Sequence, residues 1–152
     1  MTKPEFDIDA YMAWEEEQAE RHEYLAGEVF PMWQLRIDRA DAVFYPDVFV
    51  TCDLRDRQPD ACLAKQYPSL IVEVLSDSTA AFDRGRKFEL YQQIDTLREY
   101  LLIEQDREHA DLFRKNDEGL WVLHPAGPGD VIRLDGIGAE LALEALYEDV
   151  EL

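Results

Sequence analysis

The chain has 152 residues, of which 47% are hydrophobic and 32% are charged, a balance typical of one ordinary globular domain. Its formal net charge of −19 argues against a broad basic surface that binds the phosphates of nucleic acid. No apolar stretch is long enough to span a membrane, and the N-terminus lacks the basic-then-apolar pattern of a signal peptide. We therefore expect a cytoplasmic protein with no membrane partner, in which Cys52 and Cys62 are reduced thiols or, as the alternative, form a disulfide.

Hydrophobic periodicity predicts the elements of the first third of the chain. A helix is expected over residues 7–20, followed by a strand or hairpin over residues 22–30. Residues 35–38 alternate between apolar and polar side chains, which indicates a short strand. Residues 43–52 predict one apolar strand, in which Pro46 interrupts the pairing because proline has no N–H to donate.

The middle of the chain combines a buried strand with a helix. Residues 55–66 are polar and predict a loop or a short helix, and residues 70–75 predict a buried strand that contains a single carboxylate, Glu73. A helix is expected from Asp83 onward, with Asp83 as its N-cap rather than as a catalytic acid. Tyr91 lies on the apolar stripe of this helix and is expected to be a core residue.

The last third of the chain is dominated by strand signals. Residues 98–104 predict a third buried strand, and residues 109–123 predict a hairpin that turns at residues 116–119. A short strand is expected near residues 131–134, and residues 141–147 predict a helix or a strand. The order of elements indicates an α/β or α+β fold in which helices pack on a sheet.

Three polar side chains stand out among apolar neighbours: Asp47, Glu73 and Lys87. An unpaired buried carboxylate costs several kcal/mol, so Glu73 needs a metal ion, a lysine or open water, and the alternative is that it faces solvent. If the strands that carry them are neighbours, Asp47 and Glu73 converge, and two such carboxylates repel each other unless a proton or a cation intervenes. Lys87 also lies four residues after Asp83, and an ordinary helical ion pair would account for that spacing. Two acids, a hard cation and a lysine together suit hydrolysis of a phosphodiester.

The sequence motifs around these residues are more specific than the three residue types alone. The chain resembles the Uma-two family of predicted restriction endonucleases, a branch of the PD-(D/E)XK nuclease superfamily, from about Phe6 to Leu146. The strongest markers are Tyr45-Pro46-Asp47, Glu73-Val74-Leu75-Ser76, Asp83-Arg84-Gly85-Arg86-Lys87 with Tyr91, and Glu99-Tyr100.

The resemblance implies a restriction-endonuclease-like fold, a mixed β-sheet flanked by helices, and a catalytic site at Asp47, Glu73 and Lys87. Asp47 and Glu73 would ligate Mg²⁺ or Mn²⁺, the carbonyl of Val74 could add a ligand, and Glu23 or Glu28 could supply a further acid. The superfamily lysine usually lies two residues after the glutamate, where this chain has Leu75, and in this family it has moved to the following helix.

The implied function is metal-dependent hydrolysis of DNA by an endonuclease that forms a homodimer. The alternative is a catalytically inactive family member that acts as a dimeric interaction or regulatory module.

The chain departs from the family pattern at the join between Met32 and Trp33. Family members usually carry an extra helix and strand between the opening strands and Tyr45-Pro46-Asp47. We expect a single domain over residues 1–152 that lacks this helix and strand, or a longer natural chain whose intervening residues are absent here. A true deletion would uncover an apolar patch, near which we expect Trp33, Leu35 and Phe44.

Overall fold

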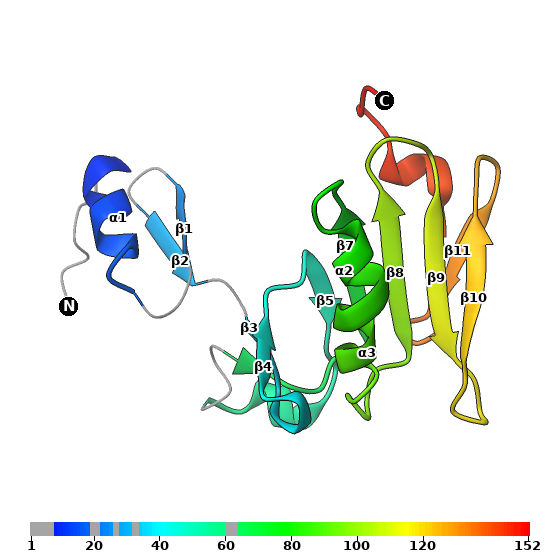
Figure 1. The fold of residues 1–152 in the computed structure, drawn as a ribbon, viewed down its shortest axis with the longest axis horizontal. Helices are drawn as coiled ribbons and strands as arrows, with labels where there is room; N and C mark the ends of the chain where they lie inside the picture. The colour runs from blue at the N-terminus through cyan, green and yellow to red at the C-terminus, as the bar shows by residue number, and fades with distance from the viewer. Residues whose placement is uncertain (1–7, 19–21, 26–27, 32–33, 60–63) are drawn as a thin grey trace.

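The fold is centred on a five-stranded mixed sheet with the strand order β10-β9-β8-β7-β5 (Figure 1). It is given by a computed structural model that describes residues 8–18, 22–25, 28–31, 34–59 and 64–152. Parallel pairing joins β7 to β8, and the other neighbours in this sheet are antiparallel. The strands are β5 (Val48–Val50), β7 (Leu70–Leu75), β8 (Glu99–Glu104), β9 (Ala110–Lys115) and β10 (Trp121–Ala126).

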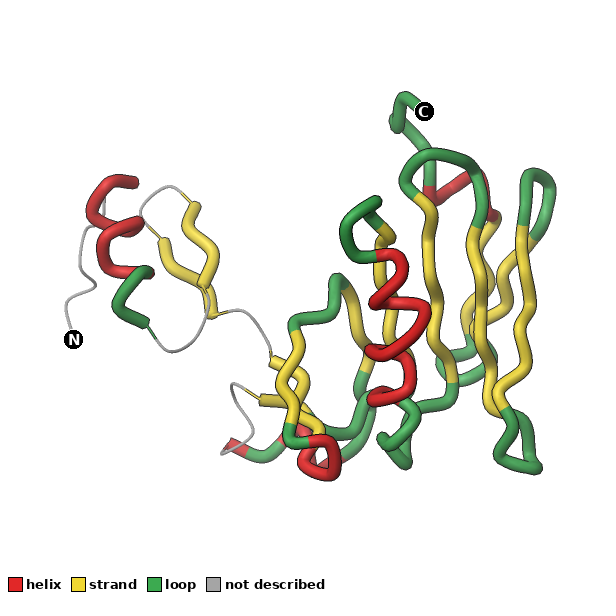
Figure 2. Tube along the Cα trace, viewed as in Figure 1, coloured by secondary structure: helices red, strands yellow, loops and turns green. Residues whose placement is uncertain are grey.

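One continuous helical segment connects the parallel strands β7 and β8 and covers one face of the sheet (Figure 2). It consists of α2 (Ala80–Phe82), a π-helical turn (Asp83–Lys87) and α3 (Phe88–Tyr91). A parallel pair needs such a crossover, because a tight turn cannot return the chain in the same direction. The helix therefore begins before Asp83, and the N-cap predicted there is wrong: Thr79 holds the cap position and Asp83 is buried inside the segment.

The apolar residues of β7 alternate between two cores. Ile71 and Leu75 pack with Tyr91 under the helical segment. Leu70 and Val72 point to the opposite face. There the covering layer is β11 (Val131–Leu134), β12 (Ala139–Ala142) and a 3₁₀ turn (Leu143–Leu146). Successive strand residues face opposite sides, so a strand buried on both faces has a nearly continuous apolar run.

Pro46 divides the strand that was predicted over residues 43–52 into two. β4 (Ala42–Phe44) pairs with β3 (Gln34–Ile37), which also pairs with β6 (Ala64–Lys65) in a separate three-stranded sheet. β5 instead forms the edge of the five-stranded sheet. The single-strand prediction is wrong because the missing N–H of proline breaks the ladder, and the two halves then join different sheets.

The N-terminal elements are a helix and a hairpin. α1 (Ile8–Glu15) is shorter than predicted, and a hydrogen bond of 2.6 Å from the Tyr11 hydroxyl to the carbonyl of His22 ties it to the hairpin. Antiparallel pairing of β1 (His22–Leu25) with β2 (Glu28–Pro31) confirms the predicted hairpin, and its turn lies outside the described residues. Figure 1 shows these elements to one side of the five-stranded sheet.

Two other connections are determined by local hydrogen bonds or by backbone conformation. The predicted loop over residues 55–66 contains a 3₁₀ turn, Leu54–Arg57, in which the buried Asp56 accepts hydrogen bonds from Thr51 and from the backbone of Gln66 and Tyr67. The β9–β10 hairpin is confirmed. It turns at Gly119, whose φ of 82° suits a residue without a side chain.

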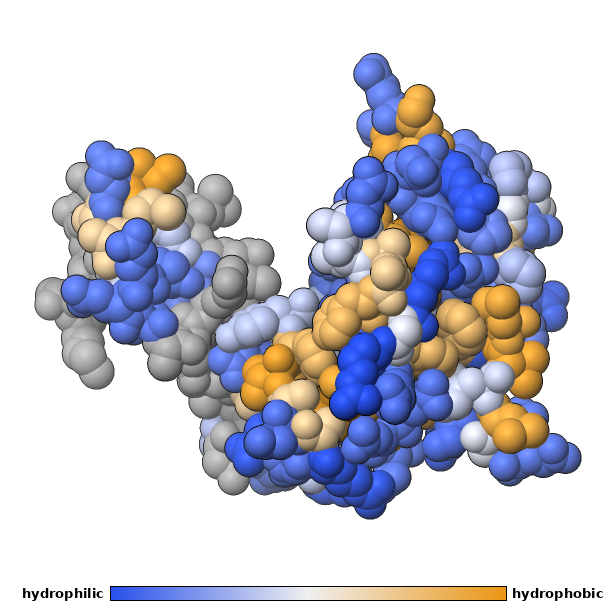
Figure 3. Space-filling model, viewed as in Figure 1, coloured by the Kyte–Doolittle hydropathy of each residue, from blue (hydrophilic) through white to orange (hydrophobic). Residues whose placement is uncertain are grey.

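Of the three residues expected near an uncovered apolar patch, the structure describes Leu35 and Phe44. Leu35 has no exposed surface and Phe44 is half-buried in the core under the helical segment. Trp33 lies outside the described residues. On the face of the sheet that the helical segment covers, Figure 3 shows apolar side chains interspersed with strongly polar ones. Cys52 is an exposed free cysteine, and Cys62 is not among the described residues. The described helices include none that is long and apolar enough to cross a membrane.

Candidate functional site

Glu73 is a buried carboxylate on the face of β7 that the helical segment covers. Only 4% of the residue is exposed. Its Oε1 lies 2.7 Å from Nζ of Lys87 and accepts a hydrogen bond of 2.8 Å from the hydroxyl of Tyr91. Lys87 and Tyr91 are four residues apart on one helix, so their side chains reach the same point on the sheet. Of the partners left open by the sequence, a lysine holds Glu73, which does not face solvent.

Asp47 lies beside Glu73 at the edge of the sheet. The register pairs Val48 with Val72, which places Asp47 next to Glu73 on the neighbouring strand. The backbone N–H of Asp47 donates to Oε2 of Glu73 over 3.4 Å. The Asp47 Oδ2 accepts a hydrogen bond of 2.7 Å from the backbone N–H of Val74. Asp47 is exposed, so this carboxylate is the part of the site that solvent reaches.

Lys87 lies between two buried carboxylates. Its Nζ is 2.7 Å from Oε1 of Glu73 and 3.2 Å from Oδ1 of Asp83, and the lysine side chain is 12% exposed. The hydroxyl of Tyr100 donates to the carbonyl of Asp83 over 3.1 Å and so fixes the start of the π-helical turn. Such turns widen a helix locally and are frequent at functional sites.

The electrostatics of the site follow from burial and from this charge pattern. Desolvation raises the pKa of Glu73 above its ordinary value, and the hydrogen bonds from Lys87 and Tyr91 oppose that rise. The negative charge of Asp47 raises the pKa of Glu73 further. Burial beside Glu73 also raises the pKa of the Tyr91 phenol, so Tyr91 remains a hydrogen-bond donor at neutral pH.

The donor set fits a divalent cation. The site holds three carboxylates, those of Asp47, Glu73 and Asp83, and one ammonium, that of Lys87, which contacts Glu73 and Asp83. The site therefore carries an excess of two negative charges when all four groups are ionised. Asp47 and Glu73 offer oxygen ligands from adjacent strands, which is what Mg²⁺ and Mn²⁺ prefer. Within the described part of the chain, no three His, Cys, Asp or Glu side chains form a complete metal cage. Mg²⁺ commonly keeps several water ligands, so the residues that could hold it are Asp47 and Glu73 with the backbone carbonyl of Val74.

The remaining predicted residues lie elsewhere. Glu23 and Glu28 are on β1 and β2, their side chains lie outside what the structure describes, and a role for either in the site stays a prediction. The core position predicted for Tyr91 is confirmed, but sequence reasoning missed the hydrogen bond from its hydroxyl to Glu73. The ion pair between Asp83 and Lys87, one of the sequence-based alternatives, is present. The spacing of Asp83, Lys87 and Tyr91, four residues apart in each step, was the signal that all three share one helix face.

Comparison with known proteins agrees with this fold and with these sequence motifs. A family model named Uma2 and described as "Putative restriction endonuclease" matches residues 33–145. The "Uncharacterized protein slr1290" of Synechocystis sp. is 34% identical over 177 aligned positions, which cover 95% of this chain and 92% of that protein. This alignment is longer than the 152-residue chain, so it includes positions at which the chain has no residue. The "Uncharacterized protein sll1609" of the same organism is 30% identical over 74% of this chain and 82% of its own length.

A solved structure shows the same fold. It is described as a putative nuclease belonging to DUF820 from Anabaena variabilis, with a TM-score of 0.64 and 11% identity over 94% of this chain and 98% of that one. At this identity the likeness concerns the fold alone. The family match covers most of the chain, including Asp47, Glu73 and Lys87. The chain therefore belongs to the Uma2 family, whose members are described as putative restriction endonucleases.

Proposed function

We propose that this protein is a nuclease that hydrolyses DNA phosphodiester bonds with a bound Mg²⁺ or Mn²⁺. The observation that carries the proposal is the pairing of Asp47 with Glu73 on adjacent strands, with Lys87 held against Glu73. An exposed carboxylate beside a buried one, with two more negative charges than positive ones, is an unfavourable arrangement that a divalent cation would relieve.

Each residue has a distinct role in this proposal. Asp47, Glu73 and the carbonyl of Val74 would hold the cation, which supplies a Lewis acid and an activated water when bound. Lys87 keeps its ammonium at the edge of the site, where it can stabilise negative charge that develops on a phosphate oxygen. Tyr91 and Lys87 hold Oε1 of Glu73, and Oε2 accepts from the backbone N–H of Asp47.

Plasmid nicking tests the proposed reaction. The full chain is incubated with supercoiled DNA and Mg²⁺ or Mn²⁺ at low ionic strength, because the net charge of −19 weakens DNA binding. Wild-type protein should nick the plasmid, and Asp47→Ala should abolish nicking. The matched control is Asp117→Ala, which removes an exposed carboxylate from the β9–β10 turn and should leave nicking unchanged. Metal-dependent nicking that survives in Asp47→Ala would remove this site from the proposal.

Thermal unfolding with and without Mg²⁺ tests the cation directly. A ligand that binds only the native state stabilises it, by about 2.7 kcal/mol at a concentration 100 times the Kd. The Tm of the wild type should rise with Mg²⁺, and Glu73→Gln should lose the rise. An equal rise in both proteins would indicate diffuse binding by the acidic surface instead.

A wild type that binds the cation without nicking DNA would favour the alternative, an inactive family member that acts as an interaction or regulatory module. The homodimer expected from the family resemblance is part of the proposal under either function, and sedimentation of the purified chain would test it.

A further inference from the structure

Asp83 is a buried acid whose carboxylate pairs with the lysine of the site. It is 3% exposed, and Nζ of Lys87 lies 3.2 Å from its Oδ1. Lys87 thus bridges Asp83 and Glu73, both buried, whereas Asp47 is exposed at the sheet edge. The attraction within a buried ion pair often does not repay the desolvation of its two charges, so stability alone is a weak reason for a buried Asp83.

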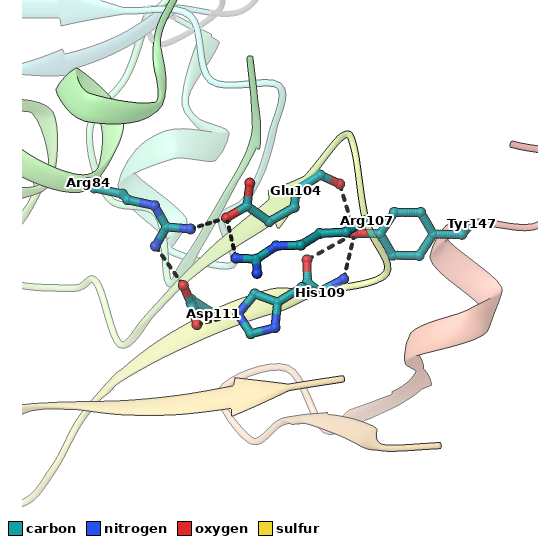
Figure 4. Close-up of polar contacts among 6 residues, drawn as sticks. All are labelled: Arg84, Glu104, Arg107, His109, Asp111 and Tyr147. Atoms are coloured by element: carbon teal, nitrogen blue, oxygen red, sulfur yellow. Dashed lines mark hydrogen bonds and ion pairs between the residues drawn. The ribbon is translucent and has the colours of Figure 1, made fainter. Parts of the chain in front are cut away.

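The position of Asp83 does not depend on Lys87. The carbonyl of Asp83 accepts a hydrogen bond from Tyr100 of β8. The next residue, Arg84, is held by ion pairs of 2.5 Å to Glu104 of β8 and 2.6 Å to Asp111 of β9 (Figure 4). The π-helical turn is therefore attached to the sheet at Asp83 and at the residue that follows it, and this acid is a fixed acceptor that the flexible lysine can use.

Figure 4 also shows how the attachment is supported. His109 lies 3.0 Å from Asp111, and Arg107 contacts Glu104 over 3.3 Å. The hydroxyl of Tyr147 donates to the backbone carbonyls of Glu104 and His109, which closes the β8–β9 turn behind the two acids. These contacts give Arg84 rigid partners, so the start of the π-helical turn is positioned by the sheet.

We propose that Asp83 is a positioning residue for Lys87, which keeps the ammonium at the site while the carboxylate of Glu73 serves a cation. The inference rests on the proposed function. Without Asp83, the lysine would place its whole charge on Oε1 of Glu73 and compete with a divalent cation for that carboxylate. With Asp83, the ammonium has a second acceptor of the same sign within hydrogen-bond distance, and Glu73 is freer to act as a ligand.

The test is a double-mutant cycle on Mn²⁺ affinity, measured by isothermal titration calorimetry on the full chain. Asp83→Asn should weaken Mn²⁺ binding about tenfold, which is about 1.4 kcal/mol. Lys87→Met removes the competing charge and should tighten binding. In the Lys87→Met background, Asp83→Asn should have no effect, because the residue it positions is absent.

Two further variants separate positioning from charge and from folding. Glu89→Gln removes one negative charge from an exposed position of the same helical segment and should leave the affinity unchanged. Asp83→Glu restores the carboxylate and should recover part of the lost affinity. The Tm of every variant without metal shows that it is folded at the temperature of the titration.

The outcomes distinguish this inference from the proposed function. Wild-type protein that binds Mn²⁺ with the same affinity as Asp83→Asn overturns the inference and leaves the proposed function standing. An equal weakening by Asp83→Asn in both backgrounds shows a long-range charge effect and also overturns it. Wild-type protein that binds no Mn²⁺ removes the proposed function and the inference together.

Discussion

Replacing Tyr91 by phenylalanine isolates one hydrogen bond of the site. The Tyr91 ring has no exposed surface and contacts the rings of Phe44 and Tyr100 at centroid distances of 5.4 Å. Phenylalanine keeps this ring packing and deletes only the hydroxyl that donates to Oε1 of Glu73 over 2.8 Å. A hydrogen bond to a charged group contributes about 1.5–3 kcal/mol, so the free energy of unfolding should fall by that amount.

Tyr100→Phe is the matched control for this prediction. Tyr100 is equally buried, but its hydroxyl donates to a neutral acceptor, the carbonyl of Asp83, over 3.1 Å. A hydrogen bond between neutral groups contributes about 0.5–1.5 kcal/mol, so Tyr100→Phe should cost less than Tyr91→Phe. The difference between the variants reports the charge of Glu73, because each substitution keeps the packing of its own buried ring.

Urea unfolding at neutral pH measures both changes. For a chain of this size, each kcal/mol lowers the Tm by about 2–4 °C, so thermal scans give an independent check. Equal costs for the two variants, or a cost below about 0.5 kcal/mol for Tyr91→Phe, would refute the reasoning that Tyr91 holds an ionised Glu73.

Three further predictions concern buried carboxylates. Glu99→Ala should lower the unfolding free energy by about 3–5 kcal/mol in urea, because this 1%-exposed acid pairs with Arg114 and accepts two backbone N–H groups of the turn after β11. Asp56→Ala should cost about 3 kcal/mol or more, since two backbone N–H groups lose their acceptor, and an unchanged Tm would contradict this. Burial raises the pKa of Glu73 in the folded protein. The protonated carboxyl therefore contributes to the free energy of unfolding below its ordinary pKa, and this contribution is lost as the pH rises through the raised pKa. The unfolding free energy of the wild type minus that of Glu73→Gln should therefore fall as the pH rises above 4.5, by about 1.4 kcal/mol for each tenfold difference in proton affinity between the folded and unfolded states. A difference that grows with pH would show that Lys87 and Tyr91 outweigh desolvation.

The sequence alone determined the elements whose signals are local. The apolar run of β7 with one carboxylate, the β9–β10 hairpin at residues 116–119 and the presence of a helix after β7 all follow from short-range patterning and turn chemistry. The same patterning identified Asp47, Glu73 and Lys87 as the polar exceptions among apolar neighbours. The resemblance of the surrounding motifs to the Uma-two family then indicated that these three residues form one site.

Only the tertiary structure decided how these residues meet. Pro46 sends β4 and β5 into different sheets, and the register of β5 with β7 then places Asp47 beside Glu73. The helix begins before Asp83 and contains a π-helical turn, so Asp83 is a buried partner of Lys87 instead of an exposed cap. The physical reason is that strand pairing and the depth at which a side chain is buried depend on segments distant in the sequence. Local propensity gives little information about which acceptor a buried tyrosine or lysine will contact.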